Sequence, residues 1–170
     1  MLAIYHLRND PHKYGNTNQI NILLVYKKEG LMKYKYEIKE IGDYCRPRCK
    51  RYKATVVLLR DYSKDQIKEI IKEVTAKIKN LNYYESEKTK GWHKEIPAHV
   101  VWLYIDTKAN FTAGKMKTNW LCRTSWIDME AKDIVRPEKL GGNDSVDDIE
   151  IFWNYEMNID IFKQIKGELK

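Results

Sequence analysis

Polar and apolar residues alternate over several stretches of the chain and predict a β-sheet. Between residues 32 and 41, Tyr34, Tyr36 and Ile38 alternate with charged residues, as in a strand buried on one face. The continuous apolar run 54–59 is typical of a central strand buried on both faces, and the largely apolar stretch 98–105 predicts a second central strand. Other stretches that are apolar or that alternate between polar and apolar residues predict further strands at residues 2–8, 20–26, 118–127 and 149–155.

One segment has the helical period instead. Ser63 can cap a first turn, and Gln66 three residues later completes a capping box. The apolar stripe of this helix is formed by Ile67, Ile70, Ile71, Val74, Ile78 and Leu81. Asn158 is expected to begin a second helix. Together these patterns predict an α+β fold: a single domain over residues 1–170, with a largely antiparallel sheet of about six strands, a central amphipathic helix at 63–81 and a C-terminal helix.

The composition agrees with one globular domain. The 170 residues are 43% hydrophobic and 32% charged. There is no apolar run of about 18 to 20 residues, so a membrane partner is not expected. The first residues, MLAIYHLRND, lack the features of a secretory signal, and the cytoplasm is therefore the expected compartment.

The net charge of +7 is unevenly distributed. Residues 128–170 contain 11 acidic and 6 basic residues, whereas the first 127 residues contain 25 basic and 13 acidic residues. This asymmetry predicts a polyanionic partner for the first part of the chain. A lysine-rich surface that serves only solubility would produce the same counts and remains the alternative.

The strongest local feature is YCRPRCKRYK, residues 44–53, which we call the basic segment. Half of its residues are Lys or Arg, none is acidic, and Pro47 indicates a loop. A loop of this kind suits a phosphate backbone, with tyrosines stacking on bases or sugars. Trp92, in a polar stretch with Lys90 and Lys94, could stack in the same way. The predicted nucleic-acid-binding residues are Arg46, Arg48, Lys50, Arg51, Lys53, Tyr44, Tyr52 and Trp92; a merely solvated loop is the alternative.

The cysteines of the basic segment raise the question of a metal. Cys45 and Cys49, with Cys122 elsewhere, make an odd number that does not describe a disulfide framework. A structural zinc site usually has four Cys or His ligands in close pairs, and a dication is disfavoured beside so many cations. The expectation is therefore free thiols, no bound metal and no cofactor.

A second candidate site lies on the strand at 32–41. Glu37 and Lys39, two apart, are expected to point to the same face, where they could hold a metal and orient water. The stretch KYEIK, residues 35–39, resembles the second half of the PD-(D/E)XK nuclease motif. The resemblance implies catalytic roles for Glu37 and Lys39, although Asn21 stands where the upstream Asp would be expected. The alternative is a simple charge pair on an exposed strand face.

The acidic stretch near the end of the chain, Asp144, Asp147, Asp148 and Glu150, is expected to complement the basic half within the fold or to face a basic protein partner. The chain contains no Walker, nucleophile-elbow, dinucleotide-binding or HExxH motif. The leading hypothesis is thus a non-catalytic protein that contacts nucleic acid through its first half, as a subunit of a bacterial or phage assembly. A degenerate metal-dependent nuclease, and a protein–protein adaptor or inhibitor, are the alternatives.

Overall fold

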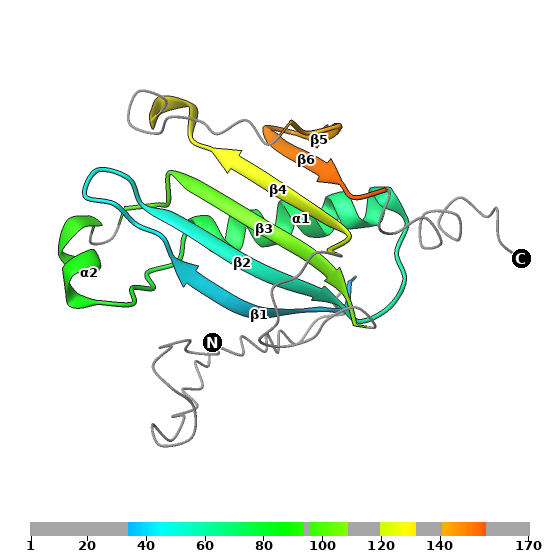
Figure 1. Ribbon diagram of the computed structural model, residues 1–170, viewed down its shortest axis with the longest axis horizontal. Coiled ribbons are helices and arrows are strands. Elements are labelled where there is room, and N and C mark those ends of the chain that lie inside the picture. The colour runs from blue at the N-terminus through cyan, green and yellow to red at the C-terminus, as the bar shows by residue number, and fades with distance from the viewer. Residues whose placement is uncertain (1–33, 94–95, 109–119, 132–140, 156–170) are drawn as a thin grey trace, which may run out of the picture.

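The computed structural model describes residues 34–93, 96–108, 120–131 and 141–155 (Figure 1). In this part of the chain the fold is α+β, as predicted. A six-stranded sheet has the order β1-β2-β3-β4-β6-β5. The strands are β1 (Tyr36–Asp43), β2 (Arg51–Leu58), β3 (Val100–Thr107), β4 (Cys122–Ile127), β5 (Asp144–Val146) and β6 (Ile149–Trp153); the helices are α1 (Lys64–Lys79) and α2 (Glu87–His93), with a 3-10 turn, η1 (Met129–Ala131).

The sheet is antiparallel except where β2 pairs with β3. Two parallel neighbours need a crossover connection, and α1 and α2 belong to the segment that makes it. Figure 1 shows α1 behind the sheet, so that the viewer looks onto the opposite face of the strands. We call this opposite face the open face, because no described helix packs on it.

Helix α1 begins where the sequence predicts. The Ser63 Oγ accepts a hydrogen bond from the backbone N–H of Gln66, and the Gln66 side chain accepts one from the backbone N–H of Ser63. This reciprocal capping box satisfies two N–H groups that a helix start otherwise leaves unpaired. The capped start fixes the phase of the helix, and with it the face that meets the sheet.

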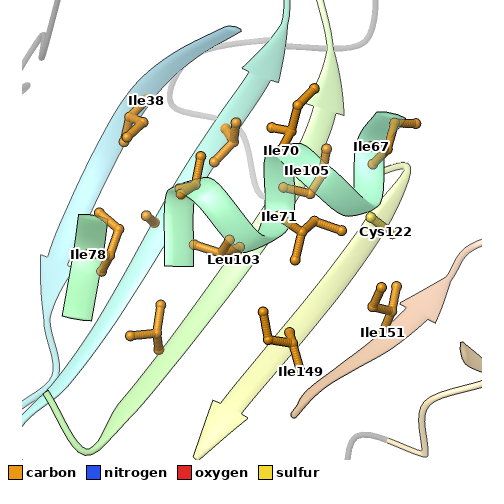
Figure 2. Packing of buried hydrophobic residues seen from close by; sticks show 14 of the residues in the cluster. Ile38, Ile67, Ile70, Ile71, Ile78, Leu103, Ile105, Cys122, Ile149 and Ile151 are labelled. Atoms are coloured by element: carbon orange, nitrogen blue, oxygen red, sulfur yellow. The ribbon is translucent and has the colours of Figure 1, made fainter. Parts of the chain in front are cut away.

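The core lies between α1 and the sheet (Figure 2). Every second residue of each strand points toward α1, so the aliphatic residues of the strands meet the apolar stripe of the helix. In β1 a bulge between Ile38 and Glu40 shifts this phase, which places both Ile38 and Ile41 in the core. The core residues labelled in Figure 2 come from β1, β3, β4, β6 and α1. Strand β2 contributes Ala54 and Val56 to the same cluster.

The acidic stretch folds back onto α1. Asp144 pairs with Lys64 at 3.1 Å and with Lys68 at 2.8 Å, and Asp147 lies 3.7 Å from Lys72. Asp147 has a φ of 50°, a left-handed conformation that Asp tolerates in a tight turn between two strands. The expectation that the acidic stretch complements basic residues within the fold is confirmed for Asp144 and Asp147. Asp148 instead accepts a hydrogen bond from the Trp126 indole, and Glu150 accepts one from the Gly142 backbone.

Other expectations need correction. The basic segment is not a loop throughout, because β1 extends to Asp43 and β2 already begins at Arg51. The polar stretch that contains Trp92 forms α2, and the acidic stretch near the end of the chain contributes a short strand, β5, that the sequence does not predict. The strands predicted at 2–8 and 20–26 and the C-terminal helix lie outside the described residues. No helix in the described ranges is long and apolar enough to cross a membrane.

Candidate nucleic-acid interface

The tip of the β1–β2 hairpin presents the arginines of the basic segment. Arg46 and Cys49 exchange two backbone hydrogen bonds, each 2.9 Å long, and enclose Pro47 and Arg48 in a tight turn. Proline favours the second position of such a turn because its φ is already fixed. Arg46, Pro47 and Arg48 are exposed, so the predicted loop is a rigid turn with two outward arginines.

Helix α2 lies against this tip, as Figure 1 shows. The Nε2 atom of His93 is 2.6 Å from the carbonyl oxygen of Arg46, and because a carbonyl only accepts, Nε2 carries the proton. His93 is buried, whereas Trp92 beside it is half-buried, with the Lys88 ammonium 5.4 Å from its ring centre. The structure therefore brings the end of α2 to the basic segment, although His93 and Arg46 are 47 positions apart in the chain.

Two residues of the basic segment point into the fold. Lys50 has 0% exposure, and its Nζ donates to the Ile96 carbonyl at 2.6 Å and to the Asn82 side chain at 3.3 Å. Burial lowers the pKa of Lys50. Tyr52, also at 0% exposure, donates its hydroxyl hydrogen to the Tyr83 carbonyl at 2.6 Å, and burial raises its pKa. These two side chains are not on the surface. They hold the β1–β2 hairpin against the segment that connects α1 to β3.

Arg51 and Lys53 lie on the open face, since they alternate with Tyr52 and Ala54 along β2. The Lys53 ammonium is 4.4 Å from the ring centre of Tyr104 and 5.8 Å from that of Tyr44. The Arg51 guanidinium is 5.9 Å from the ring centre of Trp102. Each cation of β2 therefore lies beside an aromatic ring, in the geometry of a cation–π contact.

The same arrangement continues across β4 and β6. Tyr104, Arg123 and Phe152 are direct cross-strand neighbours on β3, β4 and β6. The Arg123 guanidinium is 5.0 Å from the ring centre of Phe152 and 5.4 Å from that of Trp120, just before β4. The open face thus carries alternating cations and rings: Arg51, Lys53, Trp102, Tyr104, Trp120, Arg123 and Phe152.

These cations differ from those of α1 in their pairing. Lys64, Lys68, Lys72 and Lys77 of α1 each form an ion pair with an Asp or Glu. Within the described ranges, by contrast, no carboxylate pairs with the basic residues of the hairpin tip or the open face, namely Arg46, Arg48, Arg51, Lys53 and Arg123. Among the described residues, no paired carboxylate neutralises the positive charge of the hairpin tip and the open face.

The cysteines do not form a reactive pair. All three cysteines are free, and Cys49 and Cys122 are buried. Burial and a hydrogen bond to Asp43 raise the pKa of Cys45 to about 12. Since the thiolate is the form that binds metals and attacks electrophiles, Cys45 is poorly suited to either task near neutral pH.

Glu37 and Lys39 form an ion pair with each other. Both are half-buried on β1, next to the bulge that follows Ile38. In the described part of the chain, no group of three or more His, Cys, Asp or Glu side chains is placed to hold a metal ion. The position expected for the upstream acid, Asn21, lies outside the described residues. The geometry of this pair matches the charge-pair alternative.

Most residues of the open face are not among those predicted from the sequence. Trp102 belongs to the stretch 98–105, which predicts a central strand, but it is half-buried on the side of the sheet away from α1. The available signal was the alternation within 101–106, where Val101, Leu103 and Ile105 are aliphatic and the residues between them are Trp, Tyr and Asp. A period-two change from aliphatic to aromatic or polar side chains marks two faces with different surroundings.

Cations that alternate with aromatic rings suit a ligand that is both anionic and flat, as a chain of nucleotides is. No protein-family model, curated protein or solved structure matches the chain.

Proposed function

We propose that this protein is a non-catalytic nucleic-acid-binding protein that uses the hairpin tip and the open face as its contact surface. One observation carries the proposal: the hairpin tip and open face concentrate arginine and lysine side chains without carboxylate partners in the described residues, next to aromatic rings. On this proposal α2 adds Trp92 at one end of the surface.

The chemistry of the cations supports this choice of partner. Arg46 and Arg48 project from a hydrogen-bonded turn, so little backbone entropy is lost when they bind a phosphate. Arginine donates two parallel hydrogen bonds to one phosphate, which lysine cannot do. Acidic residues at the margins are already engaged: Glu37 pairs with Lys39, and Glu40 accepts a hydrogen bond from Thr55.

The test is a titration of binding against salt concentration. The variant Arg46→Ala/Arg48→Ala/Arg51→Ala should bind DNA and RNA more weakly than the wild type. Each lost phosphate contact should reduce the slope of log affinity against log salt by about 0.9 on duplex DNA or about 0.7 on single strands. An unchanged slope, or a wild type that binds no nucleic acid at moderate salt, would contradict the proposal.

A matched control removes the same charge from the other side of the sheet. Lys68, Lys72 and Lys77 lie on α1 and are already paired with carboxylates. Replacing these three by Ala lowers the net charge by the same amount as the arginine variant. If net charge alone drives binding, the two variants should weaken it equally; the proposal requires a much larger effect of the hairpin arginines.

A further inference from the structure

We infer that the open face binds single-stranded nucleic acid in preference to duplex, with unpaired bases stacking on its aromatic side chains. This inference rests on the proposed function and narrows it to one class of nucleic acid. It assigns the recognition of bases to residues of the second half of the chain, which the basic segment does not include. The rings concerned are Trp102, Tyr104, Trp120 and Phe152.

The geometry of the rings is the first argument. Tyr104 and Trp120 have ring centres 6.4 Å apart at an angle of 88°, and Trp120 and Phe152 are 5.7 Å apart at 62°. Three rings from three segments thus form one connected cluster on the sheet. Both pairs meet edge to face, an arrangement that neighbouring aromatic side chains prefer.

The environment of the rings is the second argument. Trp102 packs against Val100 and Cys49 and is half-buried. Tyr104, Trp120 and Phe152 are half-buried as well. Large rings at several neighbouring positions of one sheet face are costly to leave in contact with water. A base stacked on such a ring contributes about 1–3 kcal/mol, and any base can do so because all have a flat π-face.

The cations supply the third argument. Lys53 lies between Tyr44 and Tyr104, Arg51 lies beside Trp102, and Arg123 lies against Trp120 and Phe152. The Nε atom of Arg123 is buried without a hydrogen-bond partner among the described residues. A phosphate on this face would meet a cation next to every ring that receives a base. In a duplex the base faces are already stacked on one another, and only the phosphates would be recognised.

The test compares ring removal with ring retention at the same positions. Fluorescence anisotropy would measure affinity for oligo(dT), oligo(U) and a duplex, each of about 12 units, within the range of known site sizes. Trp102→Leu and Phe152→Leu remove a ring, whereas the controls Trp102→Phe and Phe152→Tyr keep one. Each Leu variant should lose about 5- to 150-fold in affinity for the single strands, with the salt slope unchanged. The controls should stay close to the wild type, and duplex affinity should not change. The oligo(dT) and oligo(U) arms show whether DNA or RNA is preferred.

A second measurement does not depend on the variants folding. Stacking on Trp102 and Trp120 should quench the tryptophan fluorescence of the wild type when oligo(dT) binds, and heparin, a polyanion without bases, should quench it much less. Equal quenching by both would overturn the inference, as would equal losses for the Leu variants and their ring-retaining controls. If the arginine variant weakens binding but the Leu variants do not, the proposed function stands and this inference fails. If the wild type binds no nucleic acid, both fail.

Discussion

Replacing Lys50 by methionine would remove a charge from the inside of the fold and keep most of the side-chain volume. Lys50 is fully buried, and its ammonium contacts the carbonyl of Ile96, the side chain of Asn82 and the rings of Tyr52 and Tyr84. The sequence alone predicts that Lys50 binds nucleic acid. The substitution therefore separates a structural role from a role in binding.

Two opposing effects set the size of the expected change. Hydrogen bonds from a charged donor contribute about 1.5–3 kcal/mol each, but Ile96 is 44% exposed and Asn82 is exposed, so water can replace the lost donor. Burying an ammonium group costs several kcal/mol, and that cost disappears in the variant. We expect the free energy of unfolding of Lys50→Met to lie within about 1 kcal/mol of the wild type. Lys50→Ala, which leaves a cavity, should lose about 2–5 kcal/mol, as large-to-small core substitutions do.

The assay is urea unfolding of both variants at several pH values. Because burial lowers the pKa of Lys50 below its ordinary value of 10.5, the unfolded chain keeps this proton to a higher pH than the folded chain. Between the two pKa values the unfolded state binds more protons, so wild-type stability gains as pH rises. Lys50→Met lacks this gain. The difference between the two proteins should therefore move in favour of the wild type as pH approaches 10.5.

A large loss would refute this reasoning. If Lys50→Met costs more than about 3 kcal/mol near neutral pH, the hydrogen bonds outweigh the cost of burying the charge. If Lys50→Met lowers both the affinity for nucleic acid and the salt dependence of that affinity, as expected for loss of the hairpin arginines, then the Lys50 ammonium contacts the ligand. Its buried position would then not be the one in which it binds nucleic acid.

Four further predictions test other features. Ser63→Ala should lower the free energy of unfolding by about 1 kcal/mol through loss of the helix cap, and no loss would mean that the capping box does not stabilise α1. Burial raises the pKa of Asp144, but hydrogen bonds from two α1 lysines and an indole N–H outweigh this effect and lower the pKa below its ordinary 3.8. Wild-type stability should therefore fall, relative to Asp144→Asn, as pH drops below about 4. Parallel pH profiles of the two proteins would contradict this. Cys45, with a pKa of about 12, should react with iodoacetamide at pH 8 far more slowly than a model thiol, since only about one thiol in ten thousand is ionised; alkylation at the rate of a model thiol would show that its pKa is not raised. Glu37→Gln should change stability by no more than about 1 kcal/mol and leave binding intact, while a Mg²⁺-dependent cleavage activity that this variant abolishes would support the nuclease alternative.

The features of the fold that depend on neighbours in sequence were predictable. The Ser63–Gln66 spacing located the start of α1, and the largely apolar runs 54–59 and 98–105 located the two strands that form the parallel pair. In each case the deciding interactions are within a few residues, or come from simple burial against any apolar partner.

The features that depend on distant partners were not predictable in the same way. Lys50 counts as a surface residue until the Ile96 carbonyl, 46 residues away, satisfies its ammonium. Helix α2 is too short to show a period, and it is held by the contact of His93 with the Arg46 carbonyl. An apolar run also does not reveal which of its members are rings on a partly solvated face, as the position of Trp102 shows.

The parallel pairing of β2 with β3 has a consequence for any attempt to shorten the protein. Parallel neighbours cannot be joined by a tight turn, so the cations of β2 and the rings of β3 meet only after the chain has passed through α1 and α2. A synthetic peptide of residues 44–53 would carry the positive charges of the hairpin but neither Trp102 nor Tyr104, and nothing in it would fix Lys50 or Tyr52 inward. Such a peptide should behave as a plain polycation. The arrangement of charge and ring belongs to the assembled sheet and cannot be grafted from one segment.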